Sequence, residues 1–179
     1  MPRITPVTTT DAATQSTLDA VKAKIGMVPN LYATFAQAPA VLNGFLALGD
    51  ALSKGILTAA QREIVALATA QTNGCHYCIS AHTLLGKGAG LSADAMRDAR
   101  HGKGGNAIDN AIAALAVKLV QARGSISDAD LAAARVAGLD DAHIVEVIAH
   151  VAYNTLTNFT NNVAQTDIDF PVVSLTLAA

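Results

Sequence analysis

Glycine and proline residues interrupt this chain at intervals of roughly ten to thirty residues, and good helix formers fill the segments between them. Alanine and leucine are abundant in these segments. Alternating runs of β-branched residues are absent except in the last nine residues, so the rest of the sequence lacks the pattern that is typical of half-buried strands. The sequence therefore predicts an all-α fold, a helical bundle of stacked helical hairpins.

Capping residues divide the chain into predicted helices. Thr58 and Gln61 have the spacing of a capping box, Pro39 suits the first turn of a helix, and Gly26 and Gly55 are suited to ending one. We expect helices over about 10–24, 31–35, 39–53, 58–72, 75–88, 92–100, 107–122, 127–136 and 140–162. An extended tail is expected after them.

The chain is expected to form a single domain over residues 1–179. A chain of this length buries roughly 70% of its unfolded surface around one core. We expect the core motif at 58–100, a candidate second half-repeat at 106–165 and the extended tail at 169–179. The half-repeat is suggested by a likeness in pattern between SKGILTAAQREIVALA and GLDDAHIVEVIAHVA.

The charge balance excludes some classes of partner. Twelve Lys and Arg residues against 14 Asp and Glu give a net charge of −2, which is unsuited to neutralising a phosphate backbone. With 51% apolar residues the chain can fold around a core, and its longest apolar run, 111–117, is far shorter than the ~20 residues of a membrane span. We expect a soluble, cytoplasmic protein that binds neither nucleic acid nor membrane.

The two cysteines of the chain lie three positions apart, which places them on one helix with a histidine. On a helix that begins near Cys75, successive residues advance by about 100°, so Cys75, Cys78 and His82 share an arc of about 60°. The positive end of the helix dipole favours a thiolate there, and it favours Cys75 most. Glu63, on the preceding helix, could fold back to hold the His82 imidazole.

Three interpretations of this cluster remain open from the spacing alone. A redox pair would form a sulfenic acid on one cysteine and resolve it as a disulfide with the other. A metal site would take Cys75, Cys78 and His82 as ligands, with Glu63 or His76 as a fourth. The third interpretation is structural, two small buried thiols beside a histidine of the core.

The wider pattern resembles a known family. Glu63, eleven residues, Cys75, two residues, Cys78, three residues and His82, within an alanine-rich helical hairpin, resemble the signature of the alkyl hydroperoxidase D (AhpD) family. That family belongs to the wider carboxymuconolactone decarboxylase superfamily. The segments KIGMVPNLYATFAQAPAVLNGFLAL and NTLTNFTNNVAQTDIDFP extend the resemblance to the peroxidase-related branch over most of 22–171.

The resemblance implies roles for individual residues. Cys78 would attack the peroxide, Cys75 would resolve the product as a disulfide, and Glu63 and His82 would relay protons. Well-studied members carry a histidine where this chain has Tyr77, so the relay is expected to be shortened or to use the phenol.

The family also implies partners and alternatives. His76, beside Tyr77, is a further auxiliary candidate. The expected substrate is hydrogen peroxide or an organic peroxide, reduced without a metal or other cofactor. A lipoyl or thioredoxin-like thiol donor and a homo-oligomer, trimeric or hexameric, are expected by family. The alternatives are a metal-binding or redox-sensing protein that is not an enzyme, and an enzyme of the carboxymuconolactone decarboxylase type.

The last long helix carries a polar stripe on an otherwise apolar surface. Glu146, His150, Asn154, Asn158 and Asn161 fall within about 120° of one another on the helix. Polar groups on a buried helix need partners, so we expect an internal network or a subunit interface there, and the stripe could also border the cysteine groove.

Overall fold

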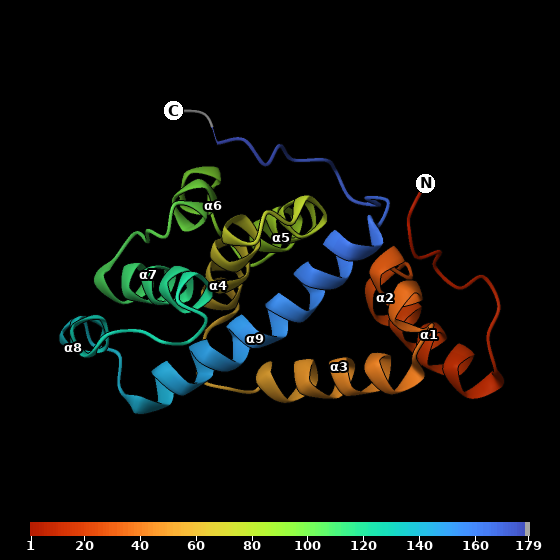
Figure 1. The fold of residues 1–179 in the computed structure, drawn as a ribbon, viewed down its shortest axis with the longest axis horizontal. Coiled ribbons are helices and arrows are strands. Elements are labelled where there is room, and N and C mark those ends of the chain that lie inside the picture. The colour runs from red at the N-terminus through yellow and green to blue at the C-terminus, as the bar shows by residue number, and fades with distance from the viewer. Residues whose placement is uncertain (178–179) are drawn as a thin grey trace.

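The computed structural model describes residues 1–177, which form α-helices joined by turns and loops with no strand among them (Figure 1). The predicted all-α class is therefore confirmed. The helices are α1 (Ala12–Ile25), α2 (Asn30–Phe35), α3 (Pro39–Leu52), α4 (Ala59–Thr72), α5 (His76–Gly88), α6 (Ala93–Arg100), α7 (Ala107–Gln121), α8 (Asp128–Val136) and α9 (Asp141–Ala164). None of these helices has both the length and the hydropathy needed to cross a membrane.

Helix α4 lies at the centre of the fold and packs against α5, α6, α7 and α9. Every residue from 64 to 70 is buried, and three of these seven residues are alanines whose small side chains let the neighbouring helices approach closely. The predicted capping box is present at its start. The Gln61 N–H donates to Thr58 Oγ1 at 3.2 Å, and the Thr58 N–H donates to Gln61 Oε1 at 3.0 Å.

Two helix boundaries differ from the prediction in ways that affect the site. Helix α9 continues beyond 162 to Ala164, where Gln165 ends it in the left-handed conformation with a φ of 51°. Cys75 precedes the first turn of α5 as its N-cap, with an extended backbone. Its side chain is therefore held at the end of the helix instead of on the helical stripe that the sequence predicted.

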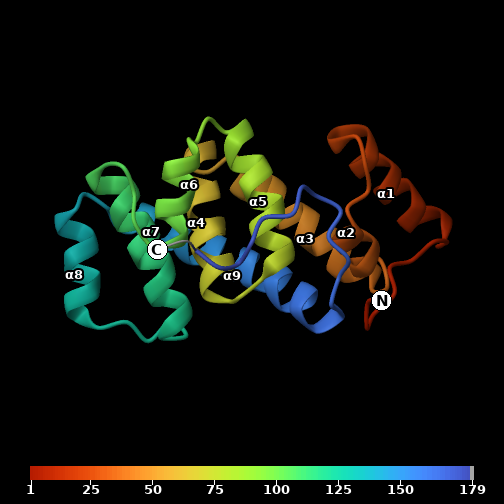
Figure 2. The same cartoon turned by 90° about the horizontal axis from the view of Figure 1, so that it is seen from above.

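The tail after α9 is extended, as predicted, and crosses α5 (Figure 2). The Val173 N–H donates to Ser80 Oγ at 3.1 Å, and the Arg100 guanidinium donates to the carbonyl oxygen of Ser174 at 2.7 Å. These bonds fasten the tail to α5 and α6, so α5 has α4 on one side and the tail on another.

Candidate active site

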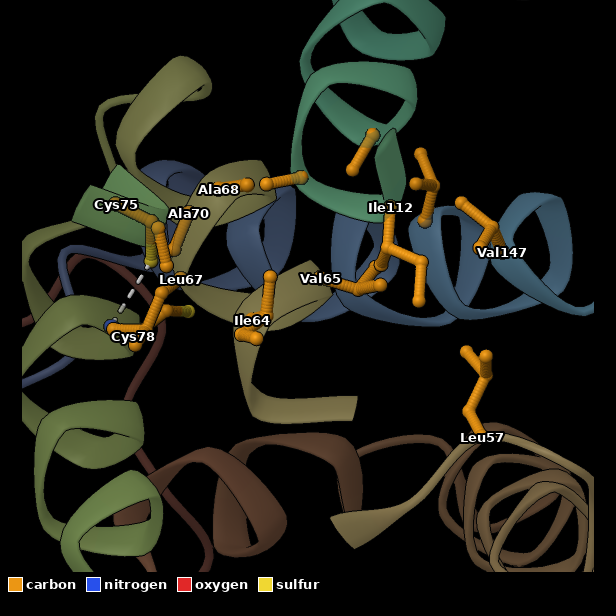
Figure 3. Packing of buried hydrophobic residues seen from close by; sticks show 14 of the residues in the cluster. Leu57, Ile64, Val65, Leu67, Ala68, Ala70, Cys75, Cys78, Ile112 and Val147 are labelled. Atoms are coloured by element: carbon orange, nitrogen blue, oxygen red, sulfur yellow. Dashed lines mark hydrogen bonds between the residues drawn. The ribbon is translucent and has the colours of Figure 1, made fainter. Parts of the chain in front are cut away.

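The two thiols lie at the turn between α4 and α5. Gly74 takes a positive φ of 63°, which reverses the chain after α4 and brings Cys75 to the start of α5. The Cys78 N–H donates to Cys75 Sγ at 3.3 Å, so the thiol of Cys75 serves as the side-chain cap of the helix (Figure 3). Both cysteines are free thiols, and their exposed fractions are 0% and 2%.

Helix α9 supplies the other wall around Cys78. The Asn161 side-chain amide donates to Cys78 Sγ at 3.4 Å, and the Thr157 hydroxyl oxygen lies 4.0 Å from the same sulfur. Asn161 was expected on a polar stripe that could border the groove, whereas Thr157 was not singled out in the sequence. Thr157 lies one helical turn before Asn161, so the same periodicity could have revealed it.

The two thiols differ strongly in acidity. Burial opposes ionisation of Cys78, but hydrogen bonds from Cys75 and Asn161 and the positive charge of His82 lower its pKa to about 6. The pKa of Cys75 is raised, first because its thiol donates to the Cys78 sulfur and then because it is buried. The expectation that Cys75 would be the more acidic thiol is therefore wrong. A helix dipole acts on both sulfurs, whereas the side-chain hydrogen bonds favour only one of them as thiolate.

Glu63 and His82 form an ion pair between α4 and α5. Glu63 Oε2 lies 2.8 Å from His82 Nδ1, as the sequence expected from a carboxylate folding back over the groove. Burial alone would lower the pKa of His82, but the Glu63 carboxylate raises it above its ordinary value. The two side chains retain exposed fractions of 19% and 17%. Solvent therefore reaches this pair while the thiols stay covered.

The two auxiliary candidates do not join this ion pair. The Tyr77 hydroxyl accepts the Leu31 N–H at 3.4 Å, and its ring packs edge-on against Phe170 at 5.5 Å. Burial and the neighbouring Asp169 raise the pKa of Tyr77, so its phenol stays protonated. The expectation that the relay uses this phenol is not supported by these contacts. His76 is half-buried, and its Nε2 has no hydrogen-bond partner within residues 1–177.

The metal interpretation requires at least three ligands at one point. Within residues 1–177 no three side chains of His, Cys, Asp or Glu are arranged to hold a metal ion. Glu63 turns toward the Nδ1 atom of His82 and pairs with it, and His76 stands apart from this contact. The geometry therefore favours hydrogen bonding over coordination in this cluster.

The polar stripe of α9 is an internal network, one of the two arrangements expected for it. Asn158 is fully buried and accepts a hydrogen bond from the Asn73 side chain at 2.9 Å. Glu146 accepts the N–H groups of Ile56 and Leu57 at 2.8 and 3.1 Å, which fixes the loop before α4. The stripe thus ties α9 to both ends of α4, on which Glu63 stands.

An aromatic cluster lies within electrostatic reach of the Glu63 carboxylate. Tyr153 of α9 stacks on Phe45 with ring centroids 4.3 Å apart, and Phe35 and Tyr32 pack on Phe45 at 5.0 and 5.6 Å. Burial raises the pKa of Tyr153, and the neighbouring Tyr32 and the Glu63 carboxylate raise it further. Glu63 therefore pairs with His82, whose charge favours the Cys78 thiolate, and it also lies within electrostatic reach of the ring of Tyr153. No local pattern pointed to Tyr153, since only the fold brings it within electrostatic reach of Glu63.

Known proteins with this fold carry the same arrangement of helices. The family model described as the carboxymuconolactone decarboxylase family matches residues 39–117, which include Glu63, both cysteines and His82. The crystal structure of an uncharacterized peroxidase-related protein of Ralstonia eutropha JMP134, an alkylhydroperoxidase AhpD core, is 26% identical with a TM-score of 0.80 over 93% of each chain. Residues 39–117 thus match the carboxymuconolactone decarboxylase family, and the chain has the AhpD-like fold.

Two further comparisons set the limits of this relationship. An uncharacterized protein of Haemophilus influenzae is 49% identical over 47 residues, which are 26% of this chain and 42% of that protein's length. The debrominase Bmp8, in a structure with 2,3,4-tribromopyrrole, is 17% identical with a TM-score of 0.76 and covers 93% of this chain and 91% of its own. Related folds therefore carry enzymes with different reactions, and the reaction of this chain has to be argued from its own site.

Proposed function

We propose that the protein is a thiol peroxidase that reduces hydrogen peroxide or organic peroxides through a disulfide formed by Cys75 and Cys78. The observation that carries the proposal is the geometry of two buried thiols on one helical turn, in which the Cys75 sulfur accepts the Cys78 N–H at 3.3 Å and the Cys78 sulfur accepts from the Asn161 amide at 3.4 Å. The pKa of Cys78 is lowered to about 6, whereas that of Cys75 is raised, so one sulfur is a nucleophile at neutral pH and the other keeps its proton.

In the first step the Cys78 thiolate attacks one oxygen of the peroxide. The O–O bond breaks as the S–O bond forms, so Cys78 is oxidised by two electrons to a sulfenic acid and the peroxide is reduced. The leaving oxygen takes a proton and departs as water or an alcohol. His82 is suited to donate that proton because the Glu63 carboxylate, 2.8 Å away, keeps the imidazole charged.

In the second step Cys75 resolves the sulfenic acid. Its sulfur attacks Cys78 Sγ, the S–S bond forms, and the S–O bond breaks to release water, with the Cys75 proton going to the departing hydroxyl. The Cys75 sulfur already accepts the Cys78 N–H at 3.3 Å, so the two sulfurs start within one helical turn. An external dithiol, of the lipoyl or thioredoxin-like class, must then supply two electrons to regenerate both thiols.

Substrate access is suited to small or apolar peroxides. The exposed fractions of Glu63 and His82 are below one fifth, and Tyr153 lies within electrostatic reach of Glu63. An alkyl group could pack on the aromatic cluster while the O–O bond reaches the thiolate. We therefore expect organic hydroperoxides to be accepted together with hydrogen peroxide.

Peroxide consumption with candidate reductants tests the proposal. Hydrogen peroxide and cumene hydroperoxide would be assayed with dihydrolipoamide and with a thioredoxin system. We expect Cys78→Ser to abolish turnover and Cys75→Ser to consume at most one equivalent, leaving a sulfenic acid on Cys78 that a dimedone probe labels. Full multiple turnover in either variant would refute the disulfide cycle.

Two measurements separate the alternatives. Stoichiometric zinc in the freshly purified protein, with the thiols protected from alkylation, would favour a metal-binding protein. A lactone-processing activity that survives alkylation of both thiols would favour the decarboxylase type of enzyme. Peroxide turnover that is lost on alkylation supports the peroxidase.

A further inference from the structure

Helix α9 has its polar side chains inside the fold and its apolar side chains outside. His150, Asn154, Thr157, Asn158 and Asn161 are all buried. The large apolar residues on the opposite face are exposed, with fractions of 64% for Val145, 56% for Phe159 and 60% for Val163. A helix on the surface of a protein that stays alone normally shows the reverse arrangement. The outer face of α9 therefore has the composition of a buried surface.

Five exposed apolar residues of α9 and the half-buried Ala149 follow a heptad spacing, whereas the exposed Ile148 lies beside it. We call them the outer seam of α9, which consists of Val145, Ala149, Ala152, Leu156, Phe159 and Val163. Their separations are four, three, four, three and four residues, the spacing at which two helices pack side by side in a coiled coil. No Asp, Glu, Lys or Arg occurs between positions 147 and 164. Charge repulsion between two such seams is therefore absent along most of their length.

The seam matches itself when a second copy runs in the opposite direction. In an antiparallel pair, residues whose numbers have the same sum face each other. With the axis at the level of Asn154, Ala149 faces Phe159 of the second copy and Ala152 faces Leu156. Each large side chain thus meets a small one, whereas a parallel pair would set Phe159 against Phe159 and leave Ala149 against Ala149.

A shallow, open groove lies at one end of the seam. It holds about 600 Å³ and lies between the end of α3 and the start of α9. Its lining is mostly small or apolar: Ala51, Leu52, Gly55, Ala142, Val145 and Ala149, with Asp141 and Glu146 at the side. Ala149 and Val145 are the seam positions that Phe159 and Val163 of an antiparallel second copy would face.

We infer that two copies of this chain pair through the outer seam of α9, antiparallel about a two-fold axis, with Phe159 of each copy entering the groove of the other. The seam exposes on the order of 500 Å² of apolar surface, which reaches the size of the largest patches on monomers. A stable interface needs about 800 Å² per partner, so the seam supplies more than half of that area.

This pairing also bears on the homo-oligomer expected from the family resemblance. A hexamer built from three two-fold pairs would contain the interface, whereas a trimer with only a three-fold axis would not. Because the inner face of the same helix carries Asn161 and Thr157 beside Cys78, pairing would hold that wall of the site in place.

Sedimentation velocity of the full chain over a range of concentrations tests the interface. We expect an even-numbered oligomer in the wild type and a rise of about 100-fold in the dissociation constant of the pair in Phe159→Glu, because a carboxylate would be buried in an apolar groove. Val136→Glu is the matched control, since Val136 is 90% exposed on α8 and lies outside the seam.

Circular dichroism would verify that both variants are folded, and Leu156→Lys provides a second disruption if Phe159→Glu is not. A monomeric wild type at tens of micromolar, a trimer with no two-fold pair, or an unchanged association in a folded seam variant would overturn the inference.

Cross-linking tests the antiparallel direction. Val145 and Val163 of one chain are about 27 Å apart along the helix, so they cannot be joined within a chain. We expect the double variant Val145→Cys with Val163→Cys to form a covalent dimer under mild oxidation, and neither single variant to do so. The wild type controls for the native thiols, which are buried. A covalent dimer of either single variant would indicate a parallel pair and overturn the proposed arrangement.

Discussion

Glu63 Oε2 lies 2.8 Å from His82 Nδ1 and joins the middle of α4 to α5 next to the buried thiols. The carboxylate raises the pKa of His82, and the resulting positive charge is one of the causes that lower the pKa of Cys78. The partly exposed pair of Glu63 and His82 thus favours ionisation of the buried Cys78 thiol.

Replacing Glu63 tests this coupling. In Glu63→Gln the imidazole loses the charge that keeps it protonated, and burial then lowers the pKa of His82. The pKa of Cys78 is expected to rise, and a rise of about one unit would slow the reaction with peroxide at pH 6 by about fivefold. Stopped-flow rates between pH 5 and 8 measure the shift. Asp94→Asn, which removes an exposed carboxylate paired with Arg97, should leave the profile unchanged; an unchanged profile in Glu63→Gln would contradict the coupling.

The unequal acidity of the thiols predicts a titration. The pKa of Cys78 lies below its ordinary value, so its thiolate forms as pH rises through about 6 and is lost as pH falls below it. Ultraviolet absorbance of the thiolate between pH 4 and 8 should show one step, absent in Cys78→Ser. Cys75→Ala should move the step to higher pH, and Cys75→Ser, which keeps a donor, should move it less. A step that survives Cys78→Ser would assign the acidic thiol to Cys75.

Asn161 is predicted to tune the thiolate from α9. Its side-chain amide donates to Cys78 Sγ at 3.4 Å, and Asn161→Ala removes that donor. We expect the pKa of Cys78 to rise and the rate with peroxide at pH 6 to fall by several-fold. Asn162→Ala is the matched control, because Asn162 donates to the Asn73 carbonyl oxygen and touches neither sulfur. Equal titration curves for the two variants would show that Asn161 has only a structural role.

Two glycines of α3 predict opposite effects on stability. A Cβ at Gly44 would meet no atom within 4 Å, so Gly44→Ala should stabilise the fold by about 0.5–1 kcal/mol through helix propensity. A Cβ at Gly49 would overlap the Tyr153 hydroxyl and disturb its stacking on Phe45. Gly49→Ala should therefore destabilise by about 1–3 kcal/mol. Urea unfolding at one fixed protein concentration measures both, and stabilisation of both variants alike would contradict the predicted contact.

Much of the fold could be predicted because its signals are local. The capping box of Thr58 and Gln61, the left-handed Gly26 after α1 and the spacing of apolar residues depend on neighbours within a few positions. For the same reason the stripe of α9 was visible as a periodic pattern. Thr157 follows that pattern as well, and it could have been included.

Contacts between distant segments were only partly predictable. The pairing of Glu63 with His82 was expected because one tight turn joins their helices. The placement of Tyr153 near Glu63 and of Asn161 against Cys78 joins residues about 80–90 positions apart, and no local pattern sets which faces of α4, α5 and α9 meet.

The sequence by itself determined the helices and their caps, and it brought two thiols, an imidazole and a carboxylate onto adjacent helices. Only the tertiary structure decided which thiol ionises. The helix dipole acts on both sulfurs and would have favoured Cys75, but the donors from Cys75 and Asn161 and the charge of His82 converge on Cys78. These hydrogen bonds depend on atomic positions in three helices, and burial strengthens each of them. The acidity of each thiol is therefore set by the tertiary structure and not by its position in the sequence.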